Sequence, residues 1–305
     1  MKKNIIFTII FLLLGVSNVN SQIGQWKSYL SYYEPTEIEE AGGNMLYVLA
    51  SNGLYSYNKK DHSLQTYDKT TVLNDCGIAH IAWCQAAKRL VIVYENNNID
   101  LLEQNNNVVN IADYMNKSMT SDKTVYSIDV SGKYTYLATG FGIVKLNVAD
   151  AEISDANQLG FKVDYSYIEG DYLYAASPTD GLYQGSLTSN LLDKANWKRV
   201  GNYTARPKTM DPNNLALVKT LSPGGPKYNN FGFIRIYQET LYTVVGGYLS
   251  VNDLHRPGCV QVLNNNDWQI YEDDLKQKTG HEFVDLNSVD TDPTNPQRVF
   301  ASGRT

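Results

Sequence analysis

The fold is decided by the stretch Gly43-Asn44-Met45-Leu46-Tyr47-Val48-Leu49-Ala50, which continues as Ser51-Asn52-Gly53-Leu54. Two close copies begin at Gly132 and at Gly170, and a glycine again follows each apolar run. A polar turn, an apolar strand that ends in small residues, a glycine turn and a second strand together make a β-hairpin. Hairpins that recur at a regular spacing predict one supersecondary unit used several times.

The spacing of the copies identifies this unit. Weaker copies begin at Lys88, Thr240 and Arg298, and the positions equivalent to Tyr47 are separated by 44, 45, 38, 68 and 57 residues. These positions are Tyr47, Val91, Tyr136, Tyr174, Tyr242 and Val299. A four-stranded propeller blade takes roughly 40 to 50 residues, so the two long steps require insertions. Residues 201–230, with four prolines and Gly224-Gly225, predict one inserted loop, and the charged residues 273–281 predict a second.

The second copy can be interpreted as a whole blade. Its expected strands are Ile78–Trp83, Leu90–Tyr94, Ile99–Leu102 and Val108–Ile111, with asparagine-rich turns at 96–98 and 105–107. Asparagine tolerates the positive φ angle that tight hairpin turns require. Valine, isoleucine, tyrosine and threonine dominate the periodic segments, and no apolar stripe with a 3.6-residue period runs through them, so a helical solenoid is rejected.

Tryptophans mark the expected fourth strands. Trp197–Val200 follows the fourth hairpin, Trp268–Tyr271 follows the fifth, and the similar segment Trp26-Lys27-Ser28-Tyr29 stands before the first. A lone fourth strand at the N-terminus would join the last blade and close the ring. The chain stops at Ala301–Thr305, where a third strand is due, so we expect the sequence to be an incomplete copy of a longer protein.

The predicted fold class is all-β: a β-propeller of four-stranded blades, with about five to six blades and a ring that is incomplete at the C-terminus. Residues 1–21 have the form of a signal peptide, with basic Lys2-Lys3, an apolar core at Ile5–Val16 and small residues before Gln22. We therefore expect export and a propeller domain over residues 22–305. No other run is long and apolar enough for a transmembrane helix.

The net charge limits the kinds of partner that the chain can bind, and the cysteine positions limit the disulfides that it can form. The formal net charge is −6, and loss of the two leader lysines makes it −8, which argues against nucleic acid as a partner. Cys76 and Cys84 flank one expected strand, whose length of roughly 26 Å exceeds the roughly 7 Å between Cα atoms that a disulfide allows. We expect these two cysteines and Cys259 to be buried free thiols.

No motif for catalysis stands out: HExxH, GxSxG, a P-loop and a GxGxxG after a strand are all missing from the sequence. His255 and Cys259 are four residues apart, but a zinc site would need two more ligands at defined spacing. The acidic run Glu272-Asp273-Asp274 is interpreted as a solvated loop, and Asp290–Pro296 as a tight turn. We therefore expect no enzyme, no catalytic, metal or cofactor-binding residues and no cofactor. Binding residues stay unassigned.

Several phrases resemble known propellers. The segment Leu46–Tyr57 is similar to the repeat of two-component regulator propellers. A closer resemblance, to PorZ-like proteins of the Bacteroidetes type IX secretion system, spans most of Gly24–Val200 and returns near Asp292–Ser302. Its strongest phrases are Gly24-Gln25-Trp26, Leu30-Ser31-Tyr32, Ala41-Gly42-Gly43, Tyr94–Leu102 and Thr139–Val144.

This resemblance implies two β-propellers and a C-terminal β-sandwich sorting domain, of which this chain would hold part of the first propeller. It implies a non-enzymatic protein of the periplasm, outer membrane and cell surface. The resemblance implies two partners. One is a sortase-like PorU-type protein, which joins secreted cargo to anionic lipopolysaccharide. The other is the anionic lipopolysaccharide itself, which the PorZ-like protein presents. No family motif in this region marks binding residues.

A second class of protein fits the repeats as well. The chain could be the periplasmic sensor propeller of a hybrid two-component regulator that binds an oligosaccharide. A propeller glycosidase fits less well, since Ser177–Gly181 departs from the spacing of an Asp-box turn. The secretion-system scaffold and the sensor differ in what would follow Thr305. The scaffold would continue with a second propeller, and the sensor with a transmembrane helix and a kinase. For a scaffold, the insertions 201–230 and 273–281 are the first candidates for partner contact.

Overall fold

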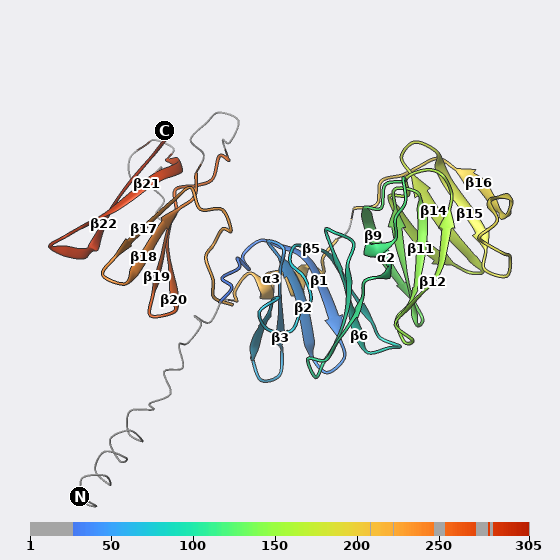
Figure 1. Cartoon of the computed structure of the whole chain (residues 1–305), viewed down its shortest axis with the longest axis horizontal. Helices are drawn as coiled ribbons and strands as arrows, with labels where there is room; N and C mark the ends of the chain where they lie inside the picture. The colour runs from blue at the N-terminus through green and yellow to red at the C-terminus, as the bar shows by residue number, and fades with distance from the viewer. Residues whose placement is uncertain are drawn as a thin grey trace, which may run out of the picture.

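The computed structural model describes residues 27–207, 209–221, 223–246, 254–272, 280 and 283–304. Within these residues it consists of antiparallel sheets, five with four strands and one with two (Figure 1). The predicted all-β propeller of four-stranded blades is therefore confirmed, and none of the described sheets closes a ring. The predicted signal peptide lies outside the described residues. The extent of the domain, residues 22–305, stays a prediction.

Four complete blades come from the N-terminal two thirds of the chain. The first blade contains β1 (Pro35–Ala41), β2 (Met45–Ala50), β3 (Gly53–Asn58) and β4 (Leu64–Tyr67). The second contains β5 (Ile78–Cys84), β6 (Arg89–Tyr94), β7 (Ile99–Glu103) and β8 (Val108–Ile111), followed by the short helix α2 (Asp113–Asn116). The third contains β9 (Val125–Ser131), β10 (Tyr134–Thr139), β11 (Gly142–Asn147) and β12 (Glu152–Gln158). The fourth contains β13 (Tyr165–Glu169), β14 (Tyr172–Ser177), β15 (Gly181–Ser186), the 3-10 helix η1 (Lys194–Asn196) and β16 (Trp197–Gly201).

The remaining strands follow a long connection that holds helix α3 (Pro212–Val218). They form the sheet of β17 (Phe233–Tyr237), β18 (Thr240–Val244), β19 (Val260–Asn264) and β20 (Asp267–Tyr271), and the hairpin of β21 (Val284–Asp292) and β22 (Asn295–Arg304). The hairpin turn confirms the predicted role of Asp290–Pro296, because the Asp292 carboxylate accepts bonds from the backbone N–H and hydroxyl of Thr294, at 2.8 and 2.6 Å.

The recurring phrase forms the second and third strands of each blade. In the first blade Leu46 pairs with Tyr57, and Leu49 pairs with Leu54. The second blade has all four predicted strands to within one residue. Its turns use Asn97 and Asn106 with φ angles of 67° and 68°, which is the left-handed conformation that asparagine tolerates.

Neighbouring blades bury the position equivalent to Tyr47. Tyr47 is 1% exposed and stacks on Trp83 of the second blade, with ring centroids 5.8 Å apart. Val91 packs into the core between the second and third blades, and Tyr136 into the core between the third and fourth. These inter-blade cores hold the first four blades together.

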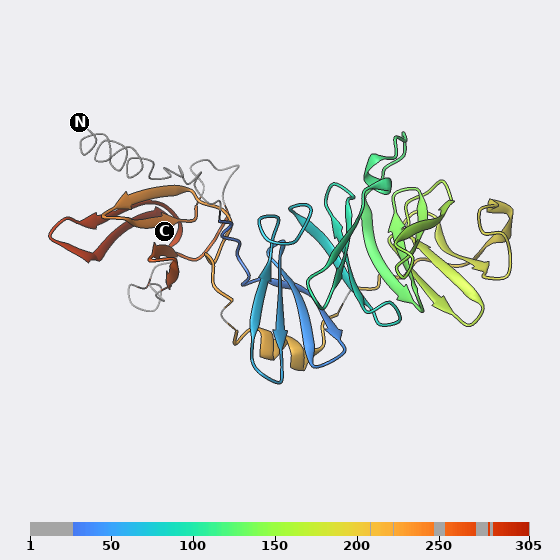
Figure 2. The same ribbon diagram turned by 60° about the horizontal axis from the view of Figure 1, so that its bottom comes forward.

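The sheets do not follow one another in space as they do in sequence. Figures 1 and 2 show an open arc in which the β17–β20 sheet lies beyond the first blade, at the opposite end from the fourth. Segment 29–34 holds this sheet: Tyr29 donates a hydrogen bond to Asn266 at 2.9 Å, and Glu34 pairs with Arg256. The expected closing strand at 26–29 is wrong for its described part, because residues 27–33 form no strand.

The insertion 201–230 is more than the predicted loop, because it contains α3. Leu217, Val218 and Leu221 pack under the first blade in one cluster with residues of β2 and β3. Asn229 then fixes the chain by bonding to the backbone of Ser31 and Ser51, at 2.6 and 2.9 Å. The insertion therefore covers the outer face of the first blade. The outer face of the fourth blade, which is its opposite side in the repeat, leaves Tyr172 40% exposed.

Replacing Asp211 with alanine should weaken this cap. The Asp211 carboxylate accepts hydrogen bonds from the backbone N–H groups of Asn213 and Asn214, at 3.0 and 2.8 Å, at the start of α3. Loss of such an N-cap lowers the free energy of unfolding by about 1 kcal/mol. Urea unfolding would measure the loss, and Asp211→Asn should retain most of the stability. Equal losses for both variants would contradict this role.

The cysteines differ from the prediction at one position. All three are free, and Cys84 and Cys259 are buried, but Cys76 is exposed on the connection between the first two blades. Burial raises the pKa of the Cys259 thiol to about 12, since desolvation disfavours the thiolate.

The thiols should therefore react in two classes. At pH 8 we expect a thiol reagent to modify Cys76 within minutes and to leave Cys84 and Cys259 unmodified until the protein is denatured. A colorimetric thiol titration would show one reactive thiol in the native protein and three after denaturation in guanidinium. Cys76→Ser should abolish the native reaction, and rapid modification of that variant would contradict the assigned burial.

Candidate functional site

The first strands of the four N-terminal blades form a common surface, which we call the channel face. Strands β1, β5, β9 and β13 contact one another in this order, as expected for strands around the central channel of a propeller. A cavity of about 330 Å³ opens on this face. Its lining comes from all four strands and from the insertion: Glu39, Ala82, Trp83, Ser127, Ile128, Asp129, Val130, Tyr165, Ser166, Arg206, Pro207 and Thr209.

Carboxylates and a histidine join the strands of the channel face. Glu37 on β1 is 5% exposed and accepts a hydrogen bond from the backbone N–H of Ile81 at 2.7 Å. Its other oxygen is 2.9 Å from Nδ1 of His80, whose Nε2 lies 3.2 Å from the carbonyl oxygen of Val125 on β9. The ring therefore lies between a carboxylate oxygen of one blade and a backbone carbonyl oxygen of another. His80 on β5 thus links three blades through Glu37 on β1 and Val125 on β9.

The insertion is held along the fourth blade by aromatic residues. The hydroxyl of Tyr165 donates to the carbonyl of Thr204 at 2.8 Å, and the hydroxyl of Tyr203 donates to Asp164 at 2.7 Å. The bond to the Asp164 carboxylate raises the pKa of Tyr203 to about 12, because a nearby negative charge disfavours the phenolate. The Arg206 guanidinium lies 5.6 Å from the ring centroid of Tyr167. The predicted contact loop therefore reaches the channel face.

The lining of this cavity is polar and aromatic. Carboxylates of Glu39 and Asp129 and the hydroxyls of Ser127 and Ser166 meet there, beside the rings of Trp83 and Tyr165. The Ser166 hydroxyl is buried and has no hydrogen-bond partner among the described residues. Such a mixture of polar groups and aromatic rings suits a polar ligand or a side chain of a partner protein.

The structure places the other predicted candidates away from this cavity. The backbone N–H of His255 donates to Asp285 at 3.1 Å, and Cys259 is buried in another cluster. In the described part of the chain, no three His, Cys, Asp or Glu residues are grouped as metal ligands would be. Glu272 pairs with Lys227. Of the second predicted contact loop, 273–281, only Gly280 lies within the described residues.

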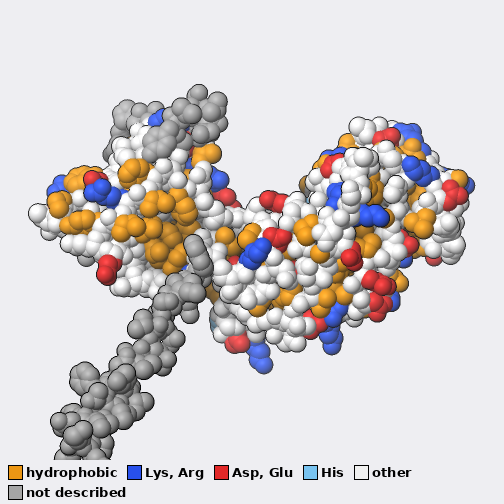
Figure 3. Space-filling model, in the orientation of Figure 1, with side chains coloured by type: hydrophobic (Ala, Val, Ile, Leu, Met, Phe, Trp, Pro, Cys, Tyr) orange, Lys and Arg blue, Asp and Glu red, His pale blue; other side chains and the backbone are white. Residues whose placement is uncertain are grey.

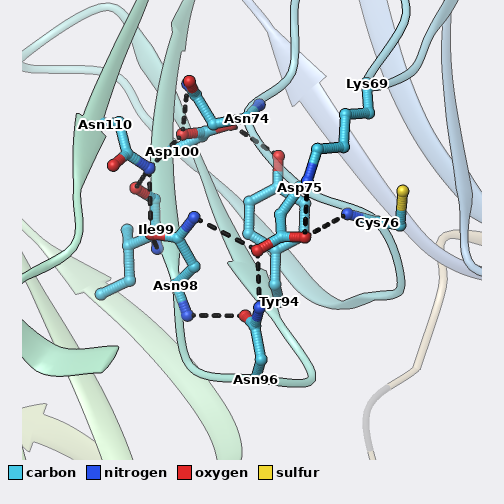
Figure 4. A network of polar contacts seen from close by, with 10 residues as sticks. All are labelled: Lys69, Asn74, Asp75, Cys76, Tyr94, Asn96, Asn98, Ile99, Asp100 and Asn110. Carbon is cyan, nitrogen blue, oxygen red and sulfur yellow. Dashed lines mark hydrogen bonds and ion pairs between the residues drawn. The ribbon is translucent and has the colours of Figure 1, made fainter. Parts of the chain in front are cut away.

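A buried polar network beside the second blade was missed by the sequence analysis (Figure 4). Asp100 on β7 is 0% exposed, and its carboxylate accepts hydrogen bonds from three residues. The donors are the Tyr94 hydroxyl at 2.6 Å, the backbone and side-chain N–H groups of Asn74 at 2.8 and 3.0 Å, and the side chain of Asn110 at 2.8 Å. Tyr94, Asn98 and Asp100 belong to the phrase Tyr94–Leu102, which carries the family resemblance. That resemblance was the one sign in the sequence that these residues matter.

The adjacent Asp75 completes this network. Its carboxylate accepts bonds from the backbone N–H of Cys76 and the side chain of Asn96, and it lies 3.5 Å from the Lys69 ammonium (Figure 4). Together Asp75 and Asp100 hold residues 68–77, which connect the first two blades. The network is therefore a structural support at the edge of the first inter-blade core.

Among the described residues, no helix is both long enough and apolar enough to cross a membrane.

The model of one protein family, the N-terminal β-propeller domain of PorZ of the type IX secretion system, matches residues 46–198. No curated protein matches the sequence.

Solved structures add a likeness of fold. PorZ of Porphyromonas gingivalis, described as an essential bacterial surface component of the type IX secretion system, is 20% identical with a TM-score of 0.76. The match covers 91% of this chain and 50% of the PorZ chain, so this chain spans about half the length of that relative.

Two extracellular domains of B. thetaiotaomicron, assigned to a one-component and a hybrid two-component system, are 14% and 13% identical with TM-scores of 0.43 and 0.42. The two matches cover 86% and 88% of this chain, and each covers 38% of the matched B. thetaiotaomicron chain. The family match extends over half of the chain and takes in all but the first and last strands of the first four blades. The chain therefore belongs to the family of PorZ N-terminal β-propeller domains of the type IX secretion system.

Proposed function

We propose that this chain is part of an exported, non-enzymatic scaffold that works at the outer-membrane surface with a sortase-like protein of the PorU type and presents anionic lipopolysaccharide. The family match over the first four blades is the observation that carries this proposal. The description of PorZ of P. gingivalis as a bacterial surface component supports it further. The channel face contributes a polar cavity suited to binding.

The charge distribution supports contact with an anionic glycolipid at the fourth blade. The chain is negative overall, but Lys194, Lys198 and Arg199 are all exposed on or next to β16. Figure 3 shows basic side chains in blue gathered at this end of the molecule. A local cluster of cations attracts anions even when the net charge is negative.

Helix α3 supplies a surface for the protein partner. Its inner side packs on the first blade through Leu217 and Val218, so it is fixed in place. Asn213, Ala216 and Lys219 are exposed, and their spacing of three residues puts them on one side of the helix. This surface belongs to the insertion that the sequence analysis selected for partner contact.

Binding to purified lipopolysaccharide tests the glycolipid role. We expect the mature protein to bind anionic lipopolysaccharide and the double variant Lys194→Glu, Lys198→Glu to bind it at least tenfold more weakly, because repulsion replaces attraction. The control Lys60→Glu, Lys117→Glu makes the same change of charge at exposed sites elsewhere and should bind normally. Equal binding by both double variants, or no binding by the parent protein, would refute the proposal for the glycolipid.

A further inference from the structure

A second cavity, of about 250 Å³, lies between the third and fourth blades, and it shares no residue with the cavity of the channel face. One wall comes from β10, β11 and β12, and the other from β14 and the connection between β15 and β16. The lining residues are Tyr136, Lys145, Asp155, Asn157, Leu173, Leu187, Ser189, Asn190, Leu191 and Leu192. We call this space the inter-blade cavity.

Sheet register puts the polar groups of the third blade on one face. Lys145 pairs with Tyr136 on one side and with Asp155 on the other, and Asn157 lies two residues beyond Asp155. Since side chains of a strand alternate between faces, these four point toward the fourth blade. The Lys145 ammonium is 3.7 Å from the Asp155 carboxylate, so the two charges of the lining balance each other.

Asn157 is the feature of this cavity that points to a ligand. The residue is 2% exposed, yet its side-chain oxygen has no hydrogen-bond partner among the described residues. Buried amide oxygens are almost always hydrogen-bonded, because leaving one unpaired costs free energy. A ligand hydroxyl or N–H in the cavity would supply the missing donor.

The other wall is preformed and consists of four leucines with the polar residues Ser189 and Asn190 among them. Leu173 is buried, while Leu187 and Leu192 are 40% and 55% exposed. The connection is held by the Trp197 indole N–H, which donates to the carbonyl of Leu191 at 2.9 Å. A wall fixed in this way needs little rearrangement when a ligand enters.

We propose that the inter-blade cavity binds one neutral sugar ring. Each sugar hydroxyl both donates and accepts, so adjacent hydroxyls can donate to Asn157 and Asp155 and accept from Lys145. The C–H face of the ring would pack on Leu173 and Tyr136. Balanced charges in the lining favour a neutral ring over a uronic acid. The inference rests on the proposed function only for the source of the sugar, which would be a residue of the lipopolysaccharide.

Titration of the mature protein with neutral methyl glycosides of glucose, galactose and mannose, followed by NMR, tests this inference. We expect at least one glycoside to bind with a dissociation constant on the order of millimolar, as a ligand of this size allows. Asn157→Leu and Lys145→Met should each weaken binding at least tenfold. Asn157→Leu should leave the unfolding temperature unchanged or higher, because it removes an unpaired polar atom.

Ser127→Ala, in the cavity of the channel face, is the matched control and should bind the glycoside normally. Binding of no glycoside, normal binding by Asn157→Leu, preference for glucuronic acid, or loss of binding in Ser127→Ala would each overturn the inference. Free glycosides require neither the cation cluster nor the protein partner. Failure of lipopolysaccharide binding by the parent protein would therefore refute the proposed function and leave the sugar cavity standing.

Discussion

Replacing Asp100 with alanine should lower the free energy of unfolding by about 3–5 kcal/mol, since removing this buried side chain leaves several hydrogen-bond donors unpaired at once. The Tyr94 hydroxyl and both N–H donors of Asn74 would lose their acceptor inside the protein. Asn110 would lose less, because its side chain also donates to Asn98 and Ile99. The connection 68–77 would be released at the edge of the first inter-blade core.

Chemical denaturation of the purified variant measures this loss. Asp75→Ala is the matched control, because it removes a partly exposed carboxylate from the same connection and should cost only about 1 kcal/mol. If both variants lost the same stability, the buried Asp100 carboxylate would not be the centre of the network.

Tyr47→Ala should cost about 3–5 kcal/mol, whereas Tyr174→Ala, at the equivalent position of the repeat, should cost less than about 1.5 kcal/mol. The difference comes from the following blade. Tyr47 is buried against Trp83, but the side of the fourth blade that carries Tyr174 has no packed blade beside it among the described residues. The cost of a truncation depends on how much packing is lost and how well the site can collapse.

Thermal and urea unfolding of both variants would compare the two positions within one chain. Tyr136→Ala gives a second reference, because Tyr136 is 4% exposed in the core between the third and fourth blades and should behave like Tyr47. A large loss for Tyr174→Ala would show that this face is covered in solution, contrary to the arrangement in Figures 1 and 2.

The blades could be predicted from the sequence because their signals are local. A hairpin depends on alternation over about six residues and on turn residues such as Asn97, whose conformation is set within a few positions. The order of the blades in space depends on long-range packing instead. Helix α3 has only seven residues, begins with a proline and is stabilised by the first blade, so no periodic pattern marked it.

Side-chain surroundings were harder to predict than strands. The closing strand at 26–29 was inferred from a tryptophan pattern that says nothing about which sheet edge lies nearby. Cys76 was expected to be buried like the other two cysteines, but the Asp75 carboxylate holds its backbone in an exposed connection. Asp100 lay in a recognised phrase, yet its partner Asn74 is 26 residues away in sequence.

In the candidate site, too, local features could be predicted from the sequence and long-range contacts could not. The insertion 201–230 was selected from its length and composition, and Arg206 places it on the channel face. The cavity residues themselves, such as Ser166 and Asp129, come from different blades and carry no motif. Their convergence follows from the arrangement of the first strands, which only the three-dimensional structure supplies.

Photo-crosslinking from the outer side of α3 tests whether this protein works with a sortase-like partner. A photoreactive amino acid would replace Lys219 in the protein as the cell produces it, with Lys60 replaced in a control, and crosslinked products would be identified by mass spectrometry. We expect a sortase-like protein of the secretion system to be crosslinked from position 219 and not from position 60. A crosslink to a sensor kinase, or the same products from both positions, would contradict it.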